Sequence, residues 1–266
     1  MKNQANIETV DKSRHAKLRV KDNPDFSHAR EFNLASIMLG ELSACTSNFP
    51  VLFVQHPDTQ TVRPVAMFGL RPGENVYYGK DGWDSTYAPL MVQRHPFTIG
   101  FDDRKENNST ELTTCLITDS PFLSEEDGVA LFTESGENTD YLASRHRMLQ
   151  EIFEGEKLTE QFTSKLIEMD LLSPFEMLIK PETGEVRKIT GMLALDERKL
   201  RALSPEKLQE LHKLDFLPAC YIILASLFQI HNLMNLRNRK EGFERVIDYR
   251  IELYPESTPA PAPAAA

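Results

Sequence analysis

The sequence predicts an α+β protein with a mainly antiparallel sheet, packed helices and a helical C-terminal part. Short apolar runs bounded by turn residues are typical of strands, whereas longer segments with an apolar residue every three or four positions are typical of helices. The two kinds of segment are interleaved without a regular strand–helix–strand rhythm, which favours antiparallel over parallel pairing. With 266 residues, 41% of them hydrophobic, the chain can bury a substantial core.

The two ends of the chain differ in composition from the middle. Residues 1–25 are polar, and the break at Asn23 and Pro24 predicts that they form a flexible polar arm. Residues 255–266 consist largely of Pro and Ala and cannot bury enough surface to offset their ordering entropy, so a disordered tail is expected. We therefore expect a single α+β domain over residues 26–254.

The sequence of the first half of this domain predicts mainly strands. Apolar residues recur at helical spacing over 32–48, which predicts a helix. The apolar runs 50–54 and 64–70 flank the turn residues 56–60 and predict a hairpin. The remaining expected elements are a strand starting at 76–78, a turn at Asp81 and Gly82, a short helix over 83–95, and strands at 97–101 and 112–118.

The second half predicts mainly helices. Residues 138–170 read as two helices in series with a break at Gly155. A hairpin is expected from 176–180 and 186–195. Asp196 is expected to cap a short turn, and Ser204 followed by Pro205 is expected to open a helix as N-cap and first residue.

The most apolar segment, residues 219–230, raises the question of a membrane span. A helix of twelve residues is about 18 Å long, which is short of the ~30 Å hydrocarbon layer. We therefore expect a core helix over residues 218–238 and no transmembrane segment.

Composition argues against several functional classes. The 40 acidic residues outnumber the 30 basic ones, and a net charge of -10 repels phosphate backbones, so no nucleic-acid partner is expected. The three widely separated cysteines predict reduced, buried thiols and a cytoplasmic location. The N-terminus lacks the apolar run of a signal peptide.

Sequence motifs for catalysis and metal binding are missing. The chain has no Gly-rich nucleotide loop, no Gly-x-Ser-x-Gly, no His-Glu-x-x-His and no Cys-x-x-Cys. Neither a metal site nor a cofactor is therefore predicted. Catalysis is not favoured, although many enzymes lack such motifs.

The most unusual passage is residues 75–97, which contains the only tryptophan and three of the seven tyrosines. Such a density of aromatic, turn-forming and charged residues suits a binding crevice, because an indole face and an arginine can hold a ligand. It equally suits a core edge, with Trp83 filling the core and Arg94 paired to Glu41 or Asp84. The candidate ligand-binding residues are Glu41, Asp81, Trp83, Asp84, Tyr87, Arg94 and His95.

Several segments, taken in order, resemble the SapC family of bacterial proteins. Each motif is short, but their order and spacing along residues 26–236 make the resemblance specific. The matching segments are 32–35 with Glu41, 49–53, 75–78, 81–83, 87–89, 94–97, 131–136, 190–200 and 224–227.

The resemblance implies little about activity. Members are often labelled peptide transporter permeases, a label at odds with a chain expected to lack a membrane span. SapC-like genes lie near those of TonB-dependent receptors and flavin-dependent halogenase-like proteins, which implies an accessory role in uptake or modification of peptides or glycans. No catalytic residues are established for the family.

Three hypotheses follow. The first is a soluble cytoplasmic accessory or binding protein whose Trp83 region contacts a protein or a small polar ligand. The second is an enzyme acting on a peptide or saccharide, which requires Glu41, Asp84, Arg94 or His95 to converge in one pocket. The third is a surface-layer or export component, which needs a route out of the cytoplasm.

Overall fold

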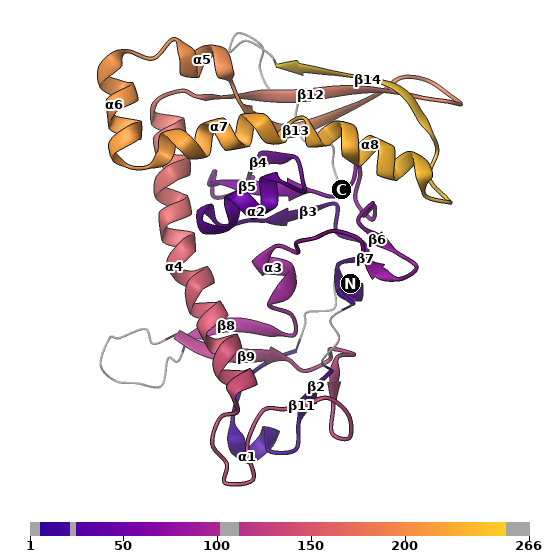
Figure 1. Ribbon diagram of the computed structural model, residues 1–266, viewed down its shortest axis with the longest axis vertical. Helices are drawn as coiled ribbons and strands as arrows, with labels where there is room; N and C mark the ends of the chain where they lie inside the picture. The colour runs from indigo at the N-terminus through magenta and orange to yellow at the C-terminus, as the bar shows by residue number, and fades with distance from the viewer. Residues whose placement is uncertain (1–5, 22–24, 102–111, 254–266) are drawn as a thin grey trace.

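The computed structural model describes residues 6–21, 25–101 and 112–253 (Figure 1). It confirms the predicted α+β class, with antiparallel sheets, packed helices and a helical C-terminal part. The largest sheet and the C-terminal helices occupy the upper part of Figure 1, two three-stranded sheets occupy the lower part, and helix α4 runs along both. The expected tail at 255–266 lies outside the described residues.

The largest sheet has six strands in the order β14-β12-β13-β4-β5-β3, and all neighbouring pairs are antiparallel. The two predicted hairpins, β4 with β5 and β12 with β13, both lie in it. Strand β14 was not predicted, and it extends the sheet beyond β12. The strands are β3 (Leu34–Ser36), β4 (Val51–Gln55), β5 (Val62–Met67), β12 (Leu172–Pro181), β13 (Arg187–Leu195) and β14 (Val246–Leu253).

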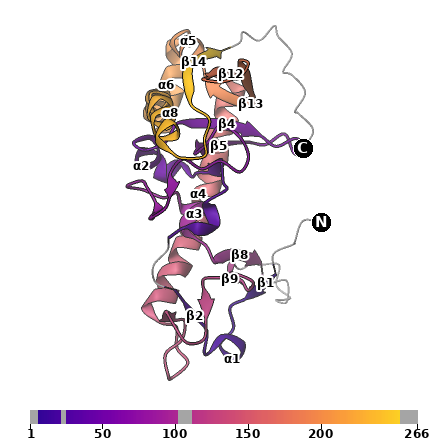
Figure 2. The same ribbon diagram turned by 90° about the vertical axis from the view of Figure 1, so that its right-hand side faces the viewer.

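Helices cover one face of this sheet (Figures 1 and 2). Helix α7 packs against α2, α6 and strands β4 and β13. The predicted caps are confirmed, since Asp196 accepts a hydrogen bond at the start of α5, and Ser204 does so at the start of α6, with Pro205 as its first residue. The helices are α2 (Leu42–Thr46), α5 (Glu197–Arg201), α6 (Pro205–Lys213), α7 (Phe216–Ser226) and α8 (Gln229–Arg239).

The expected core helix is longer than the sequence argument allowed. Together, α7 and α8 form a helical segment of 24 residues, Phe216–Arg239, which by length and composition alone could cross a membrane. The estimate from residues 219–230 was therefore too short. The same criteria are met by core helices of soluble proteins, and Cys220, Ile223 and Leu233 are buried in the main core here.

The lower part of the molecule contains two three-stranded sheets, β1-β9-β8 and β10-β2-β11. Residues 6–21, expected to belong to a polar arm, contribute β1, α1 and β2 to this part, and Asp11 caps α1. The elements are β1 (Ile7–Thr9), α1 (Lys12–His15), β2 (Arg19–Val20), β8 (Phe97–Phe101), β9 (Leu112–Ile117), β10 (Leu123–Ser124) and β11 (Val129–Ala130).

Helix α4 (Asp140–Glu168) is continuous, so the predicted break at Gly155 is wrong. Its 29 residues span about 43 Å. Leu149 belongs to the lower hydrophobic core and Phe162 to the upper one, so a single helix joins both. Gly155 serves close packing instead, because a Cβ there would lie 3.3 Å from the Cβ of Met38.

Two other predicted helices are largely wrong. Residues 32–48 begin with β3, which pairs with β5, and continue through a 3-10 turn, η2 (Leu39–Glu41), into α2. Helical spacing of the apolar residues is outweighed here by edge pairing to the sheet. Of residues 83–95, only α3 (Leu90–Gln93) is helical, and the passage before it forms the small hairpin β6 (Tyr78–Gly79) and β7 (Gly82–Trp83).

The three cysteines are free and buried, as predicted. Burial raises the pKa of Cys220 to about 12 and also raises the pKa of Cys45. Both thiols are therefore protonated at neutral pH and unreactive as nucleophiles.

Gly69 provides a test of the packing beneath the Trp83 passage. A Cβ at this position would lie 2.0 Å from the backbone oxygen of Glu74, and a backbone atom cannot move aside cheaply. Replacing Gly69 with Ala should lower the free energy of unfolding by about 3 kcal/mol or more, measured by urea denaturation. Gly40→Ala is the control, since nothing lies within 4 Å of its Cβ, and equal losses in both variants would contradict this packing.

Candidate functional site

The structure distributes the seven predicted site residues over different surroundings. Trp83 and Asp84 line an open groove, Glu41 lines a second hollow beside α4, and His95 lines a small cavity. Asp81 is exposed at the tip of the β6–β7 hairpin. The predicted residues do not all converge in one pocket.

Glu41 is a buried structural anchor. Its carboxylate accepts hydrogen bonds from the backbone N–H groups of Met38 (2.9 Å) and Leu90 (2.8 Å). The Tyr87 hydroxyl donates to it at 2.8 Å, and the Cys45 thiol lies 3.7 Å away. Burial raises the pKa of Glu41 above its usual 4.5, although these donors partly oppose that shift. Because its oxygens already have these donors, Glu41 is poorly placed to bind a ligand.

Trp83 belongs to both the core and the surface. Its ring makes edge contacts with Phe26, Phe49 and Phe68 at centroid distances of 5.8, 6.1 and 5.3 Å, and its Nε1 donates to the Tyr87 carbonyl at 2.9 Å. The side chain is nevertheless only half-buried and lines the groove. The two readings of Trp83, core filling and groove wall, are compatible.

Arg94 and His95 interact with residues other than those that the sequence suggested as partners. Arg94 donates to the Thr98 hydroxyl at 3.0 Å, and among the described residues it forms no ion pair with Glu41 or Asp84. Burial lowers its pKa. His95 stacks on His28, with ring centroids 4.1 Å apart and planes inclined by 14°.

Of the three hollows lined by predicted residues, the open groove beside Trp83 is the largest, and we call it the Trp83 groove. It has a volume of about 590 Å³, within the ~300–1,000 Å³ typical of small-molecule sites. The segment from Trp83 to Thr86 forms one wall and helix α8 forms the other. Its lining residues are Ser47, Asn48, Tyr77, Trp83, Asp84, Ser85, Thr86, Gln229, Asn232, Asn235, Leu236 and Arg239.

Hydrogen bonds fix one side of the Trp83 groove. The side-chain oxygen of Asn48 accepts from the hydroxyls of Ser85 (2.9 Å) and Thr86 (2.7 Å). On the opposite wall, no side-chain hydrogen bond or ion pair to another described residue involves Asn235 or Arg239. The groove therefore combines a preformed wall with side chains that can donate to a ligand.

Sequence reasoning missed the α8 wall entirely. A signal was present, because Gln229, Asn232 and Asn235 recur every three residues on a helix whose other side carries Ile230, Leu233 and Met234. Amides gathered on one face of a helix whose opposite face is buried indicate a solvent-exposed face that can contact polar groups.

The described residues form neither a complete metal site nor a complete site for acyl transfer. Within the described residues, no group of three or more His, Cys, Asp or Glu side chains is placed to hold a metal ion. The Ser120 hydroxyl lies 2.8 Å from Nε2 of His95, the contact expected of a nucleophile and its base. However, Ser120 is buried and also accepts from the Phe122 N–H at 3.2 Å, and the cavity beside it measures only about 40 Å³.

Comparison with known families shows to which family the chain belongs. The SapC family model matches residues 10–233, most of the chain. The chain belongs to the SapC family. No curated protein and no solved structure matches this SapC protein, so the comparison brings a family but no assigned activity.

The Glu41 anchor can be tested with Tyr87→Phe. Losing a hydrogen bond to a buried carboxylate should lower the free energy of unfolding by about 1.5–3 kcal/mol in urea denaturation. Because the pKa of Glu41 is raised, the folded protein binds this proton more tightly, and the contribution of the group falls as pH rises above 4.5. The hydroxyl stabilises the ionised form, so the loss should be larger at pH 8 than at pH 5.

Tyr221→Phe is the matched control, because Tyr221 is exposed on α7 and its removal should change stability little. A loss in Tyr87→Phe no larger than in this control would show that the Tyr87 hydroxyl does not stabilise Glu41.

Proposed function

We propose that this SapC protein is a binding protein whose Trp83 groove takes an uncharged polar ligand, such as a saccharide or a peptide segment. One observation carries the proposal: the groove is open, about 590 Å³ in volume, and lined mainly by amide and hydroxyl side chains beside an indole. Such side chains donate and accept hydrogen bonds without carrying charge.

The chemistry of the lining supports a ligand with hydroxyl or amide groups. Asn232 and Asn235 offer amide groups from one wall, and the half-buried ring of Trp83 offers apolar surface to the C–H face of a sugar or to an apolar side chain. A few placed polar groups around an apolar surface are the usual means by which sites orient a ligand.

The charges of the groove nearly balance, which supports an uncharged ligand. Asp84 and Arg239 are the only charged residues in its lining among the described residues. Burial lowers the pKa of Lys240, and the charge of Asp84 opposes this shift by favouring the ammonium form. Asp84 therefore interacts electrostatically with a residue of the protein itself as well as with the groove.

An enzyme built on the predicted residues receives less support. That hypothesis requires Glu41, Asp84, Arg94 and His95 to meet, whereas Glu41, Asp84 and His95 line three separate hollows and Arg94 is bonded to Thr98. The acyl-transfer alternative at Ser120 offers too little space for a peptide or saccharide.

Family membership supports placing such binding in an accessory role beside TonB-dependent uptake or modification of peptides or glycans. A cytoplasmic location and the absence of nucleic-acid partners remain predictions from sequence. We do not propose a permease, because a single helical segment that meets the length criterion among the described residues is weak evidence for a membrane protein, and Ile223 and Leu233 of this segment belong to the core. Cell fractionation tests the location and separates this proposal from an export component.

Ligand capture can be measured by screening the protein against glycan and peptide libraries, followed by calorimetric titration of the ligands found. Removing one groove donor that has no side-chain partner among the described residues, with Asn235→Ala or Arg239→Ala, should weaken binding about tenfold, because one hydrogen bond is worth about 1–1.5 kcal/mol. The melting temperature should change little, since both side chains lie at the surface.

Lys157→Ala is a control on the exposed face of α4, outside the groove, and should leave affinity unchanged. Capture that survives both groove substitutions at full affinity would place the ligand elsewhere. Loss of affinity in all three variants would point to a non-specific charge or stability effect.

A further inference from the structure

The outward face of helix α7 and its junction with α8 carries a row of apolar side chains, which we call the α7 stripe. Its members recur every three or four residues and therefore share one side of the helix: Leu217, Tyr221, Leu224, Ala225 and Phe228. Phe228 is 85% exposed and Tyr221 is 51% exposed. In Figure 1, α7 lies in front of the main sheet and packs on α2, α6, β4 and β13, so the stripe points away from the core.

The size of the α7 stripe sets it apart from other exposed apolar residues. Ile7, Phe32, Val186 and Ile247 are also exposed, but they lie singly in separate parts of the chain. An aromatic side chain buries about 150–250 Å² when it is covered, so the two rings of the stripe leave roughly 250 Å² of aromatic surface in water. A contiguous apolar patch of a few hundred Å² marks a contact surface, whereas single residues need no explanation.

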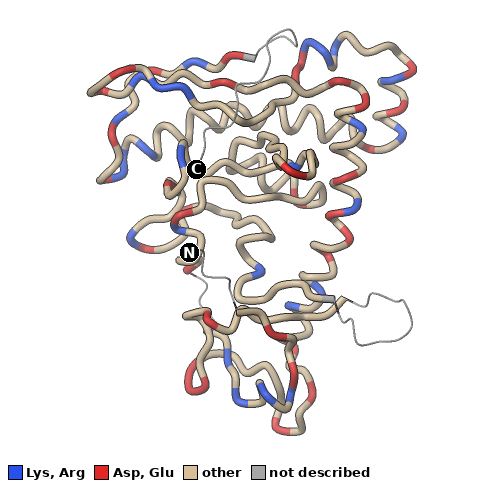
Figure 3. The backbone as a smooth tube through the Cα atoms, turned by 180° about the vertical axis from the view of Figure 1, so that it is seen from behind, with Lys and Arg blue, Asp and Glu red and all other residues tan. Residues whose placement is uncertain are grey.

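The absence of charge along the α7 stripe decides what covers it. Lys, Arg, Asp and Glu are spread along most of the chain (Figure 3), but none lies between Asp215 and Arg237. Helices that lie on a membrane surface carry Lys and Arg beside their apolar face, and the net charge of -10 is repelled by anionic lipids. A second copy of the chain, in contrast, can meet this stripe without bringing like charges together.

The order of side chains along the stripe suits self-association. We propose that the α7 stripe joins two copies of this chain in a symmetric dimer, with the two α7 helices antiparallel and crossing at Tyr221. In a two-fold interface, if residue i of one copy contacts residue j of the other, then j also contacts i. Leu217 precedes Tyr221 by four residues and Ala225 follows it by four, so the large side chain of each copy meets the small one of the other.

The same symmetry places Phe228 of each copy at the turn before α7 of the other, seven residues from Tyr221 on the opposite side. That turn carries Leu214, which is itself 44% exposed. The stripe is smaller than the ~800 Å² per partner of a standard interface, so the dimer is reversible rather than permanent.

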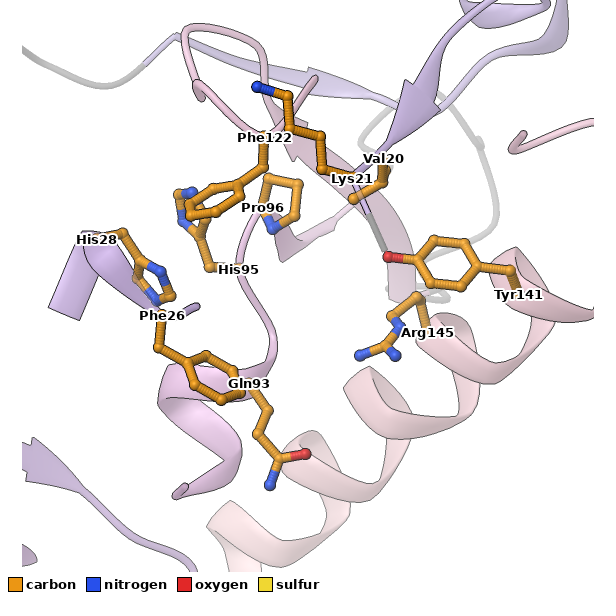
Figure 4. Close-up of a pocket in the computed structure, with 10 residues that line it drawn as sticks. All are labelled: Val20, Lys21, Phe26, His28, Gln93, His95, Pro96, Phe122, Tyr141 and Arg145. Atoms are coloured by element: carbon orange, nitrogen blue, oxygen red, sulfur yellow. The ribbon is translucent and has the colours of Figure 1, made fainter. Parts of the chain in front are cut away.

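The α7 stripe is separate from the hollows described above. The small cavity beside His95 is lined from β2, the segment between α3 and β8, and helix α4 (Figure 4). The Trp83 groove begins on this helical segment at Gln229, after the stripe ends. Substitutions within the stripe therefore leave the lining residues of both hollows in place.

Sedimentation velocity at protein concentrations of about 1–200 μM, the range expected of a small interface, tests the dimer. We expect the sedimentation coefficient to rise with concentration from the monomer value to the dimer value. Phe228→Asp places a carboxylate in the apolar contact of each copy and should weaken dimerisation at least about tenfold. The control Ile7→Asp makes the same change at a 53% exposed position on β1 and should leave dimerisation unchanged.

Disulfide trapping tests the antiparallel arrangement. Tyr221→Cys brings the thiols of two copies together at the two-fold axis, so oxidised glutathione should join them covalently. Phe228→Cys alone should not be joined, because residue 228 of one copy lies opposite Leu214 of the other, whereas a mixture of Leu214→Cys and Phe228→Cys should be. The three native cysteines are buried and do not compete.

Circular dichroism and melting temperature check that each variant is folded. The proposal is overturned if the unaltered protein stays monomeric over this concentration range, or if Ile7→Asp weakens dimerisation as much as Phe228→Asp. Disulfide formation in Phe228→Cys as readily as in Tyr221→Cys would overturn the antiparallel arrangement. Co-sedimentation of the unaltered protein with phosphatidylcholine vesicles, lost in Phe228→Asp, would assign the stripe to a membrane surface instead.

Discussion

The buried carboxylate of Glu41 is the interaction on which the arrangement of the Trp83 groove and of the small cavity beside His95 depends. A carboxylate removed from water costs several kcal/mol unless donors surround it, and here Met38, Leu90 and Tyr87 supply three. Leu90 begins α3, which leads to the cavity, and the carbonyl of Tyr87 holds the indole of Trp83. One buried charge therefore sets the path of the whole passage from Trp83 to α3.

A second buried charge fixes the opposite wall of the groove. Nε of Arg237 on α8 donates to the Glu74 carboxylate at 2.8 Å, and both side chains are buried. Glu74 precedes the segment that carries Tyr77, and the ammonium of Lys240 bonds to the backbone oxygen of Tyr78. The two walls are thus tied by ion pairing and hydrogen bonds, so the groove is preformed and a ligand need not pay for ordering it.

Local sequence signals predicted the elements that depend on local chemistry. The caps at Asp196 and Ser204 and the two hairpins of the main sheet form because their neighbours within a few residues suffice. Residues 34–36 and Gly155 misled the prediction because their roles are set by distant segments. The first pairs with β5, and the second lets α4 approach Met38, more than a hundred residues earlier in the chain.

The candidate site followed the same rule. Sequence composition located Trp83 and Asp84 on one groove wall, because an aromatic passage is visible without knowledge of the fold. The α8 wall and the pairing of His28 with His95 join segments far apart in sequence, and no local pattern reveals which of them meet. A search for amide-rich helix faces would have found the α8 wall, but nothing in the sequence marks the pairing of His28 with His95.

One ring contacts both Trp83 of the groove and the small cavity lined by His28. Phe26 contacts Trp83 at 5.8 Å and His28 at 6.3 Å, so its position shapes both. Its backbone has a φ of 54°, a left-handed conformation that costs a non-glycine residue about 1–3 kcal/mol. The ring is therefore held on two sides, and such packing is what maintains a strained backbone conformation.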